Sequence, residues 1–502
     1  MLSEVITMQK TRLAATLGVI LYAAALSASA AAPAERPNVI IIMADDLGYG
    51  DLGSYGHPIV QTPHLDAMAA NGLRLTQYYA PAPLCSPSRA GLLTGRTPFR
   101  TGIRSWIPAN KNVALGRNEQ TIAHYLKAQG YDTAVVGKWH LNAGADRRDQ
   151  PQAAEMGFNY SLVNAAGFVT SDLDRAPERP RYGVVYPNDF YRNGKPLGNV
   201  QRISGEFVSD EAVSWLARKQ PGDPFFLYVA FTEVHTPLAS PQRYLDMYQP
   251  YISAFARQHP HLFYADWADT PYRGPGEYYA NISYLDAQVG KILRQVERMG
   301  AQENTLILFT SDNGPVTREA RKWYELNMAG ETGGLRGRKD NLWEGGIRVP
   351  AIVQYRGHIP PGSVSDTPAS GLDILPTLAE LIGFPLANDR VIDGESITSL
   401  LLGGTVDRRH PMIWAIDMPQ QDDPTDMWAL RQDEWKMIFD RQSQAKYLYN
   451  LQRDPWEIDN QLGKQPQIEA RLQSALDDYR HSIEQDAVMR ARAETPTPVD
   501  WN

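Results

Sequence analysis

Short runs of consecutive apolar and β-branched residues alternate with amphipathic stretches along this chain. The segment from Pro37 to Met43 contains Val39 followed by three isoleucines. Strands without polar alternation are typical of a parallel sheet covered on both faces. Comparable runs occupy residues 134–136, 224–230, 305–310 and 351–355. These segments are therefore predicted to be buried strands of one sheet.

Between these runs, apolar residues recur every three or four positions, as on one face of a helix. The longest such stretch runs from Glu277 to Met299, and Gly300 follows it as a helix terminator. Shorter helices are expected over residues 121–129, 209–219 and 373–382. Strands that alternate with helices predict an α/β fold with a large, mostly parallel sheet flanked by helices.

The pattern changes after residue 400. Short strand candidates separated by turns lie at 412–416, 427–431, 435–439 and 446–450, and an amphipathic helix is expected over 465–485. This pattern predicts a small antiparallel sheet with one covering helix. The predicted organisation is an α/β domain over residues 36–400 and an α+β subdomain over residues 401–490.

Two long segments, 147–199 and 240–276, have little periodicity. The first contains Asn193-Gly194, a dipeptide that favours a hairpin turn, and the second is rich in aromatic residues. Insertions of this kind either shape a ligand site or decorate the surface. Both readings stay open from the sequence.

The N-terminal residues have the pattern of an export signal. Lys10 and Arg12 precede an apolar run from Leu13 to Leu26, and Ala28-Ser29-Ala30 offers a cleavage site. The alternative is a membrane anchor, but the run is shorter than the roughly 20 residues of a spanning helix. We therefore expect residues 1–30 to be a signal peptide, with no stable membrane span in the mature protein. Its expected location is periplasmic or secreted.

Charge and cysteine content exclude some classes of protein. The formal net charge is −8, which argues against nucleic acid as a partner. The chain has one cysteine, Cys85, so no disulfide can form within it. A lone cysteine in an exported protein has three explanations: it is buried in the core, it is present by chance, or it takes part in a reaction.

Acidic clusters follow two of the predicted strands. Asp45-Asp46 comes after the first strand, and Asp312-Asn313 comes after the strand at 305–310. Ligands of open α/β sheets bind beyond the carboxyl ends of the strands. Carboxylate and amide oxygens gathered there suit Ca²⁺, or Mg²⁺, better than Zn²⁺. The plainer alternative is that these residues cap helices or make turns.

The most specific motif begins at Cys85. Cys85-Ser86-Pro87-Ser88-Arg89 is followed, after three residues, by Leu93-Thr94-Gly95. This segment resembles the signature of the formylglycine-dependent (type I) sulfatases, a branch of the alkaline-phosphatase-like superfamily. Two further stretches, 130–140 and 337–350, resemble other signatures of that family, and the resemblance extends from about residue 37 to residue 451.

The resemblance implies an alkaline-phosphatase-like fold and a specific chemistry. A separate maturation enzyme would oxidise Cys85 to formylglycine, whose hydrated form, a gem-diol, would be the nucleophile on a sulfate ester. The metal ligands implied for Ca²⁺ are Asp45, Asp46, Asp312, Asn313 and the modified Cys85. The catalytic residues implied are Cys85, Arg89, Lys138, His140, His235 and Lys339.

These residue types suit the implied reaction. Arg89, Lys138 and Lys339 would bring positive charge to a transition state that spreads negative charge. His235 would protonate the departing alcohol, with Lys339 as a second candidate. His140 would then take the proton of the second hydroxyl of the diol, and collapse to the aldehyde would expel sulfate. Each of them, taken alone, has a structural alternative as a core histidine or a surface cation.

The substrate is expected to be a small sulfated compound, either an aryl sulfate or a sulfated sugar. Aromatic residues that would stack on its ring, or belong to the core, are Trp106, Trp139, Trp267, Tyr272 and Trp343. One rival function is hydrolysis of phosphonates or phosphodiesters with the same modified cysteine. Another is a non-catalytic calcium-binding or glycan-binding protein.

Overall fold

The fold was established from a computed structural model. It describes residues 36–109, 111–164, 189–198, 200, 202–235, 238, 240–258, 274–316, 329–417, 428–440 and 442–488. The predicted export segment, Trp267, Tyr272 and large parts of both aperiodic segments lie outside these residues. Among the helices that are described, none combines the length and the apolar character needed to cross a membrane.

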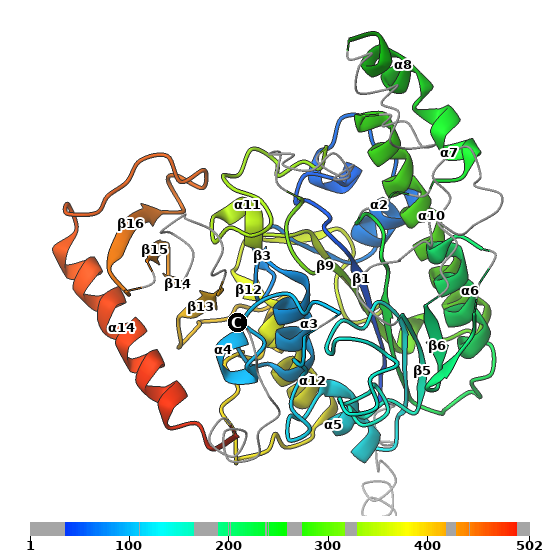
Figure 1. The fold of residues 1–502 in the computed structure, drawn as a ribbon, viewed down its shortest axis with the longest axis horizontal. Coiled ribbons are helices and arrows are strands. Elements are labelled where there is room, and N and C mark those ends of the chain that lie inside the picture. The colour runs from blue at the N-terminus through cyan, green and yellow to red at the C-terminus, as the bar shows by residue number, and fades with distance from the viewer. Residues whose placement is uncertain are drawn as a thin grey trace, which may run out of the picture. The chain divides into compact units, whose positions relative to one another are not determined.

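A large mixed sheet forms the centre of the fold (Figure 1). In the described part of the chain it has ten strands in the order β11-β2-β10-β9-β1-β8-β4-β5-β6-β7. Their bounds are β1 Asn38–Ala44, β2 Leu73–Leu75, β4 Asp132–Gly137, β5 Tyr160–Asn164, β6 Phe190–Arg192, β7 Lys195–Pro196, β8 Phe225–Ala230, β9 Thr305–Ser311, β10 Ala351–Gln354 and β11 Ser363–Ser365. All five strands expected from the apolar runs are present.

The central strands β9, β1, β8, β4 and β5 are parallel, as predicted. Antiparallel pairing begins on either side of them, where β10 pairs with β9 and β6 pairs with β5. The β6–β7 hairpin turns at Asn193 and Gly194, which have φ angles of 48° and 75°. Positive φ at both positions is the geometry that favours Asn-Gly, so the predicted turn is confirmed.

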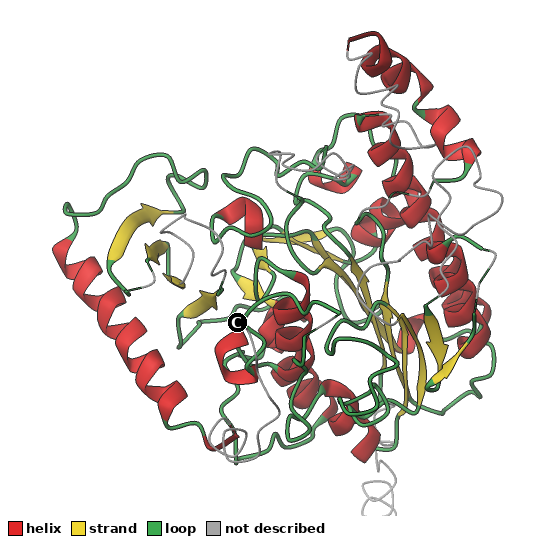
Figure 2. Cartoon of the chain, in the orientation of Figure 1, coloured by secondary structure: helices red, strands yellow, loops and turns green. Residues whose placement is uncertain are grey.

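Helices cover both faces of the sheet, which explains the continuous apolar runs. In β1, Val39, Ile41 and Met43 face a cluster with α3, α5 and α12. Ile40 and Ile42 face the opposite cluster, with α2, α6 and α10. Figure 2 shows these helices on the two sides of the strands. Their bounds are α2 Pro63–Ala70, α3 Cys85–Thr94, α5 Ile122–Ala128, α6 Ser204–Leu216, α10 Pro275–Arg298 and α12 Ile374–Ile382.

Helix α6 begins five residues earlier than the periodicity predicts. Its N-terminus is satisfied from another part of the chain, because the Glu233 carboxylate accepts a hydrogen bond of 2.8 Å from the Gly205 backbone N–H. A capping group 28 residues away leaves no local sequence signal. Shorter helices are α4 Pro98–Thr101, α7 Gln242–Met247, α8 Gln249–Gln258, α11 Glu344–Ile347 and α13 Thr398–Leu401.

The C-terminal part forms the small sheet expected from its short strands. Four antiparallel strands lie in the order β13-β14-β15-β16. Helix α14 packs against one face through Leu472, Leu476 and Tyr479 (Figure 1). Bounds are β13 Met412–Ala415, β14 Trp428–Gln432, β15 Trp435–Phe439, β16 Ala445–Asn450 and α14 Pro466–Glu484, and a separate two-stranded sheet pairs β3 Tyr78–Tyr79 with β12 Ala369–Ser370.

A fully buried ionic cluster joins the small sheet to the larger part of the fold. Lys436 on β15 lies 3.0 Å from Glu344 on α11 and 2.9 Å from Glu457, and the side chains of all three are inaccessible to solvent. Glu457 also accepts a hydrogen bond of 2.7 Å from the Glu344 backbone N–H. Because α11 follows the loop that carries Lys339, the small sheet supports one wall of the candidate site.

Candidate active site

The polar residues singled out from the sequence lie beyond the carboxyl ends of the central strands. Asp45 and Asp46 follow β1, and Asp312 and Asn313 follow β9. Lys138 and His140 follow β4, and His235 lies five positions beyond the end of β8. Because these strands are parallel, their carboxyl ends meet at one edge of the sheet.

Arg89 and Lys138 neutralise two of the buried carboxylates. The Arg89 guanidinium donates to Asp312 Oδ2 from Nε and Nη2, at 2.9 and 2.7 Å, and lies 3.5 Å from Asp45. Lys138 Nζ lies 2.5 Å from Asp45 Oδ2. The side chains of Arg89, Asp45 and Asp312 are completely buried. Desolvation on this scale is tolerated only because each charge has a partner.

Asp46 is the centre of a second group. Lys339 Nζ donates to both of its oxygens at 2.7 and 2.9 Å, and Asn313 Nδ2 donates to Oδ1 at 2.7 Å. His235 Nε2 lies 3.6 Å from Oδ2. Burial alone would raise the pKa of Asp46, but the charges of Lys339, His235 and Lys138 outweigh it and hold the pKa below its usual value. Asp46 therefore stays ionised.

Cys85 is the first residue of α3 and reaches the same group. Its Sγ and one oxygen each from Asp45 and Asp312 lie within 4.8 Å of one another. The side chain is buried, and burial raises the pKa of the thiol to about 11 although Lys138 and Lys339 act in the opposite direction. Burial and the charge of Asp45 likewise raise the pKa of Asp312 to about 6, against the guanidinium of Arg89.

The oxygen atoms of this group fit a hard divalent cation. Oδ1 of Asp45 and Oδ1 of Asn313 are buried and have no hydrogen-bond partner among the described residues. Buried acceptors without donors are uncommon in folded proteins, and two of them beside buried carboxylates are consistent with a bound cation. Ca²⁺ takes six to eight oxygen ligands, and carboxylate and amide oxygens are of that kind. The donor set thus fits the calcium site that the sequence predicts.

His140 lies at the same edge but is held by a backbone group. Its Nε2 lies 3.0 Å from the carbonyl oxygen of Ile107, and it is buried with a φ of 52°. Burial, followed by the nearby charge of Lys138, lowers the pKa of His140 well below its usual value. The neutral imidazole is therefore the resting form. The sequence does not point to Ile107, because any residue type can supply a backbone carbonyl oxygen.

The remaining predicted residues divide between the core and the rim. Trp139 and Trp343 are buried in the hydrophobic core, whereas Trp106 is partly exposed and packs against the cluster that contains Leu84. Of the neighbours of Lys339, Arg338 donates to the carbonyl oxygen of Val316 at 2.8 Å. Of the aromatic candidates that the structure describes, Trp106 is therefore the one that is not fully buried.

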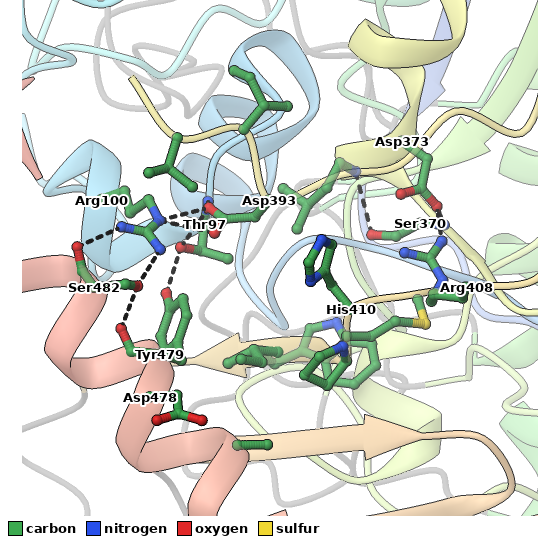
Figure 3. A pocket seen from close by; sticks show the side chains of 18 residues that line it. Thr97, Arg100, Ser370, Asp373, Asp393, Arg408, His410, Asp478, Tyr479 and Ser482 are labelled. Carbon is green, nitrogen blue, oxygen red and sulfur yellow. Dashed lines mark hydrogen bonds and ion pairs between the residues drawn. The ribbon is translucent and has the colours of Figure 1, made fainter. Parts of the chain in front are cut away.

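A separate cavity of about 360 Å³ lies between α14, β13 and α4. Figure 3 shows two bonded groups of charged side chains, with Arg100 and Asp393 on one side and Arg408 and Asp373 on the other, and Asp478 apart from both. None of the described candidate catalytic residues lines this cavity. The groups of side chains able to hold a metal ion, among the residues that the structure describes, lie at the sheet edge and not in this cavity.

Comparison with known proteins agrees with this geometry. Residues 37–384 match the sulfatase family, and residues 335–482 match the C-terminal region of N-sulphoglucosamine sulphohydrolase. Human arylsulfatase A is 36% identical over 462 residues, which cover 87% of this chain and 85% of that protein. Rat steryl-sulfatase is 35% identical over 436 residues, covering 77% of this chain and 74% of that protein.

Solved structures show the same architecture. The crystal structure of Ps i-CgsB superposes with a TM-score of 0.73 at 25% identity, covering 90% of this chain and 94% of that one. The sequence matches extend over most of the chain, and the matched part contains all the residues of the charged group. The chain belongs to the sulfatase family and is a sulfuric ester hydrolase.

Proposed function

We propose that this protein is an exported, calcium-dependent sulfatase in which Cys85 is converted to formylglycine. The observation that carries the proposal is the position of Cys85. Its sulfur lies within 4.8 Å of carboxylate oxygens of Asp45 and Asp312. Oδ1 of Asp45 and Oδ1 of the neighbouring Asn313 have no donor in the described part of the chain. A nucleophile made from this side chain would therefore be formed beside the metal.

Calcium would be held by Asp45, Asp46, Asp312, Asn313 and the modified residue 85. When bound, it would polarise a sulfate oxygen and acidify a hydroxyl beside it. Formylglycine, when formed and hydrated, would supply that hydroxyl. The four protein ligands besides residue 85 are completely buried, so water would compete weakly with a bound sulfate.

The cations around the site would bind and orient the sulfate group. Arg89 and Lys138 are already fixed by Asp312 and Asp45, so their charges are oriented before the substrate arrives. Lys339 retains partial exposure of its side chain, 13%, so a substrate could reach its ammonium group. Preorganised charge of this kind stabilises the transition state without rearrangement of the protein.

The two histidines suit opposite proton transfers. His235 is partly exposed, with 12% of its side chain accessible, and its Nε2 lies 3.6 Å from Oδ2 of Asp46. It is placed to give a proton to the departing alcohol, with Lys339 as a second donor. His140 is neutral and buried, so it is suited to accept a proton from a hydroxyl at position 85.

The substrate class proposed is an aryl sulfate or a sulfated sugar. The names of arylsulfatase A and steryl-sulfatase associate similar chains with ring-bearing sulfate esters. Trp106, beside the cluster that contains Leu84, would supply an aromatic surface for such a ring. Export is supported by the basic start, the apolar run and the small residues at 28–30.

Three measurements test the proposal. Mass analysis of the tryptic peptide that ends at Arg89 would show the exchange of H₂S for O at Cys85 in active enzyme. Rates on an aryl sulfate, an aryl phosphodiester and an aryl phosphonate would then identify the preferred ester. An unmodified thiol in active enzyme would refute the modification, and faster turnover of a phosphorus ester by orders of magnitude would refute the sulfatase assignment. Sequencing of the mature N-terminus tests export.

A further inference from the structure

A short buried segment connects the start of helix α3 with His140. The Ser86 hydroxyl oxygen accepts a hydrogen bond of 3.1 Å from the Ile107 backbone N–H. The carbonyl oxygen of the same residue lies 3.0 Å from His140 Nε2. Ser86, Ile107 and His140 are 0%, 2% and 4% exposed, so water does not compete for these bonds. The residue next to Cys85 is thus linked through one residue to the proposed base.

The carbonyl contact determines which ring nitrogen of His140 carries hydrogen. A carbonyl oxygen can only accept, so the contact requires a proton on Nε2. Nδ1 is buried and has no hydrogen-bond partner among the described residues. In the neutral ring Nδ1 therefore holds the lone pair, and it is the nitrogen able to accept a proton.

We propose that Ser86 is a positioning residue that, through Ile107, holds His140 in its Nε2–H form and leaves Nδ1 as the catalytic base atom. The proposal rests on the proposed function in one respect, the role of His140 in proton transfer. The proposal goes beyond that function because it assigns a role to Ser86, the variable second position of the Cys-x-Pro-Ser-Arg motif.

The hydroxyl of Ser86 is used for this contact and not for its own helix. Helix α3 begins after Leu84, whose side chain makes no capping hydrogen bond. Ser86 instead bonds to a backbone group 21 residues further along the chain. Alanine at position 86 would leave the Ile107 N–H buried without an acceptor, and segment 105–107 would shift to satisfy it. His140 would then lose its fixed acceptor.

The first test reads the tautomer directly and needs neither calcium nor formylglycine. The full chain is produced without the maturation enzyme and labelled with ¹⁵N-histidine, and His140→Gln identifies the His140 signals. Long-range ¹H–¹⁵N correlations distinguish the two neutral forms. We expect Nε2–H in the wild type and a mixture in Ser86→Ala. An Nδ1–H form in the wild type would overturn the proposal, whether or not Ser86→Ala folds.

The second test measures the energetic coupling between Ser86 and His140 in the matured enzyme. Each rate is divided by the fraction of Cys85 that has been converted to formylglycine. We expect Ser86→Ala to lower kcat by about 10- to 100-fold, part of what a general base supplies, with KM little changed. The same change in a His140→Ala background should have no further effect, and Ser86→Thr should restore the rate. Ser209→Ala is the control, because Ser209 is a fully buried helical serine on α6 that bonds to Gln288.

The two tests separate this inference from the proposed function. An Nε2–H signal in a protein that hydrolyses no ester would refute the function and support the positioning contact. Normal kcat of Ser86→Ala in a working sulfatase, or equal losses with and without His140, would refute the positioning role and leave the function intact.

Discussion

Arg89 donates two hydrogen bonds to a single oxygen of Asp312, with Nε and Nη2 lying 2.9 and 2.7 Å from Oδ2. Its remaining nitrogen, Nη1, donates to the backbone carbonyl oxygen of Lys138 at 2.9 Å. One planar group thus links α3, the end of β9 and the end of β4. A guanidinium can make all three contacts at once, whereas an ammonium on a shorter stem cannot.

Arg89→Lys should therefore retain a positive charge and lose much of the activity. We expect kcat/KM on an aryl sulfate to fall by about 10²- to 10³-fold, as for the loss of one oriented group at a transition state. Arg117→Lys is the matched control, because the Arg117 side chain is 50% exposed and pairs with Glu155. Equal activity of the two variants would contradict the role given to Arg89.

Cys85→Ala should abolish turnover and leave the fold intact. Loss of a catalytic nucleophile lowers kcat by about 10⁴-fold or more in hydrolases. Alanine at the first position of α3 keeps the helix, because no side-chain cap is lost. Circular dichroism and thermal unfolding check the fold, and steady-state rates check the activity. Near-normal turnover would exclude Cys85 as the source of the nucleophile.

Asp312→Ala should remove the stabilisation by calcium. A ligand that binds the folded state alone adds about 2.7 kcal/mol to the free energy of unfolding at 100 times its dissociation constant. Titration calorimetry with CaCl₂ and unfolding with and without EDTA measure the effect. The wild type should gain stability from calcium and the variant should not, and an equal gain in both would place the ion elsewhere.

Lys436→Met tests the buried cluster that supports the small sheet. Removing the ammonium leaves Glu344 and Glu457 buried without their shared partner, so unfolding should become easier by about 3–5 kcal/mol. Lys464→Met should change the free energy of unfolding by less than about 0.5 kcal/mol, because Lys464 and Asp459 are 57% and 71% exposed. Denaturant unfolding at pH 7 compares the two, and similar losses would argue against the cluster.

The buried carboxyl group of Asp286 should make the free energy of unfolding depend on pH. Burial raises its pKa to about 7, although the backbone N–H groups of Leu65 and His64 donate to it. From about pH 4 to pH 7 the folded state holds a proton that the unfolded state has lost. Stability should fall as pH rises through this range, by up to about 1.4 kcal/mol per pH unit, and level off above it.

Asp286→Asn removes one titrating group and should lower that slope by its share, up to about 1.4 kcal/mol per pH unit, while buried Asp51 and Glu233, whose pKa values are also raised to about 7, keep theirs. Urea unfolding at several pH values between 4 and 8 measures it, with Asp477→Asn on the exposed face of α14 as the control. A slope unchanged by Asp286→Asn would show that Asp286 is ionised in the folded state, and a slope lowered equally by both variants would show that the effect is not specific to Asp286.

The sequence predicts most of the sheet because its signals are local. The run of three isoleucines from Ile40 predicts a strand buried on both faces, and β1 is that strand. The Asn193-Gly194 turn joins two strands that are adjacent in the sequence, so its signal is contained in a few consecutive residues. The acidic residues after β1 and β9 meet as expected, because parallel strands bring their ends together.

Other features depend on contacts between distant parts of the chain and leave little signal. The antiparallel direction of β10 relative to β9 depends on the path of the long connection between them, which includes Lys339. Lys436 looks like a surface residue beside the apolar run that starts at Met437, yet it is completely buried. Its partners are 92 and 21 residues away, so no local pattern indicates the pair. The catalytic roles of the site residues stay predictions that the experiments above test.

The left-handed backbone at Asp46, with a φ of 61°, affects how variants of its neighbours should be read. A non-glycine residue in this region tends to relax to ordinary geometry when nothing holds it. Lys339 and Asn313 hold the Asp46 side chain, so they also hold the turn. A Lys339 variant would lose a charge and also one of the contacts that hold this backbone conformation. Crystal structures of such variants are therefore needed before their rates are assigned to missing charge.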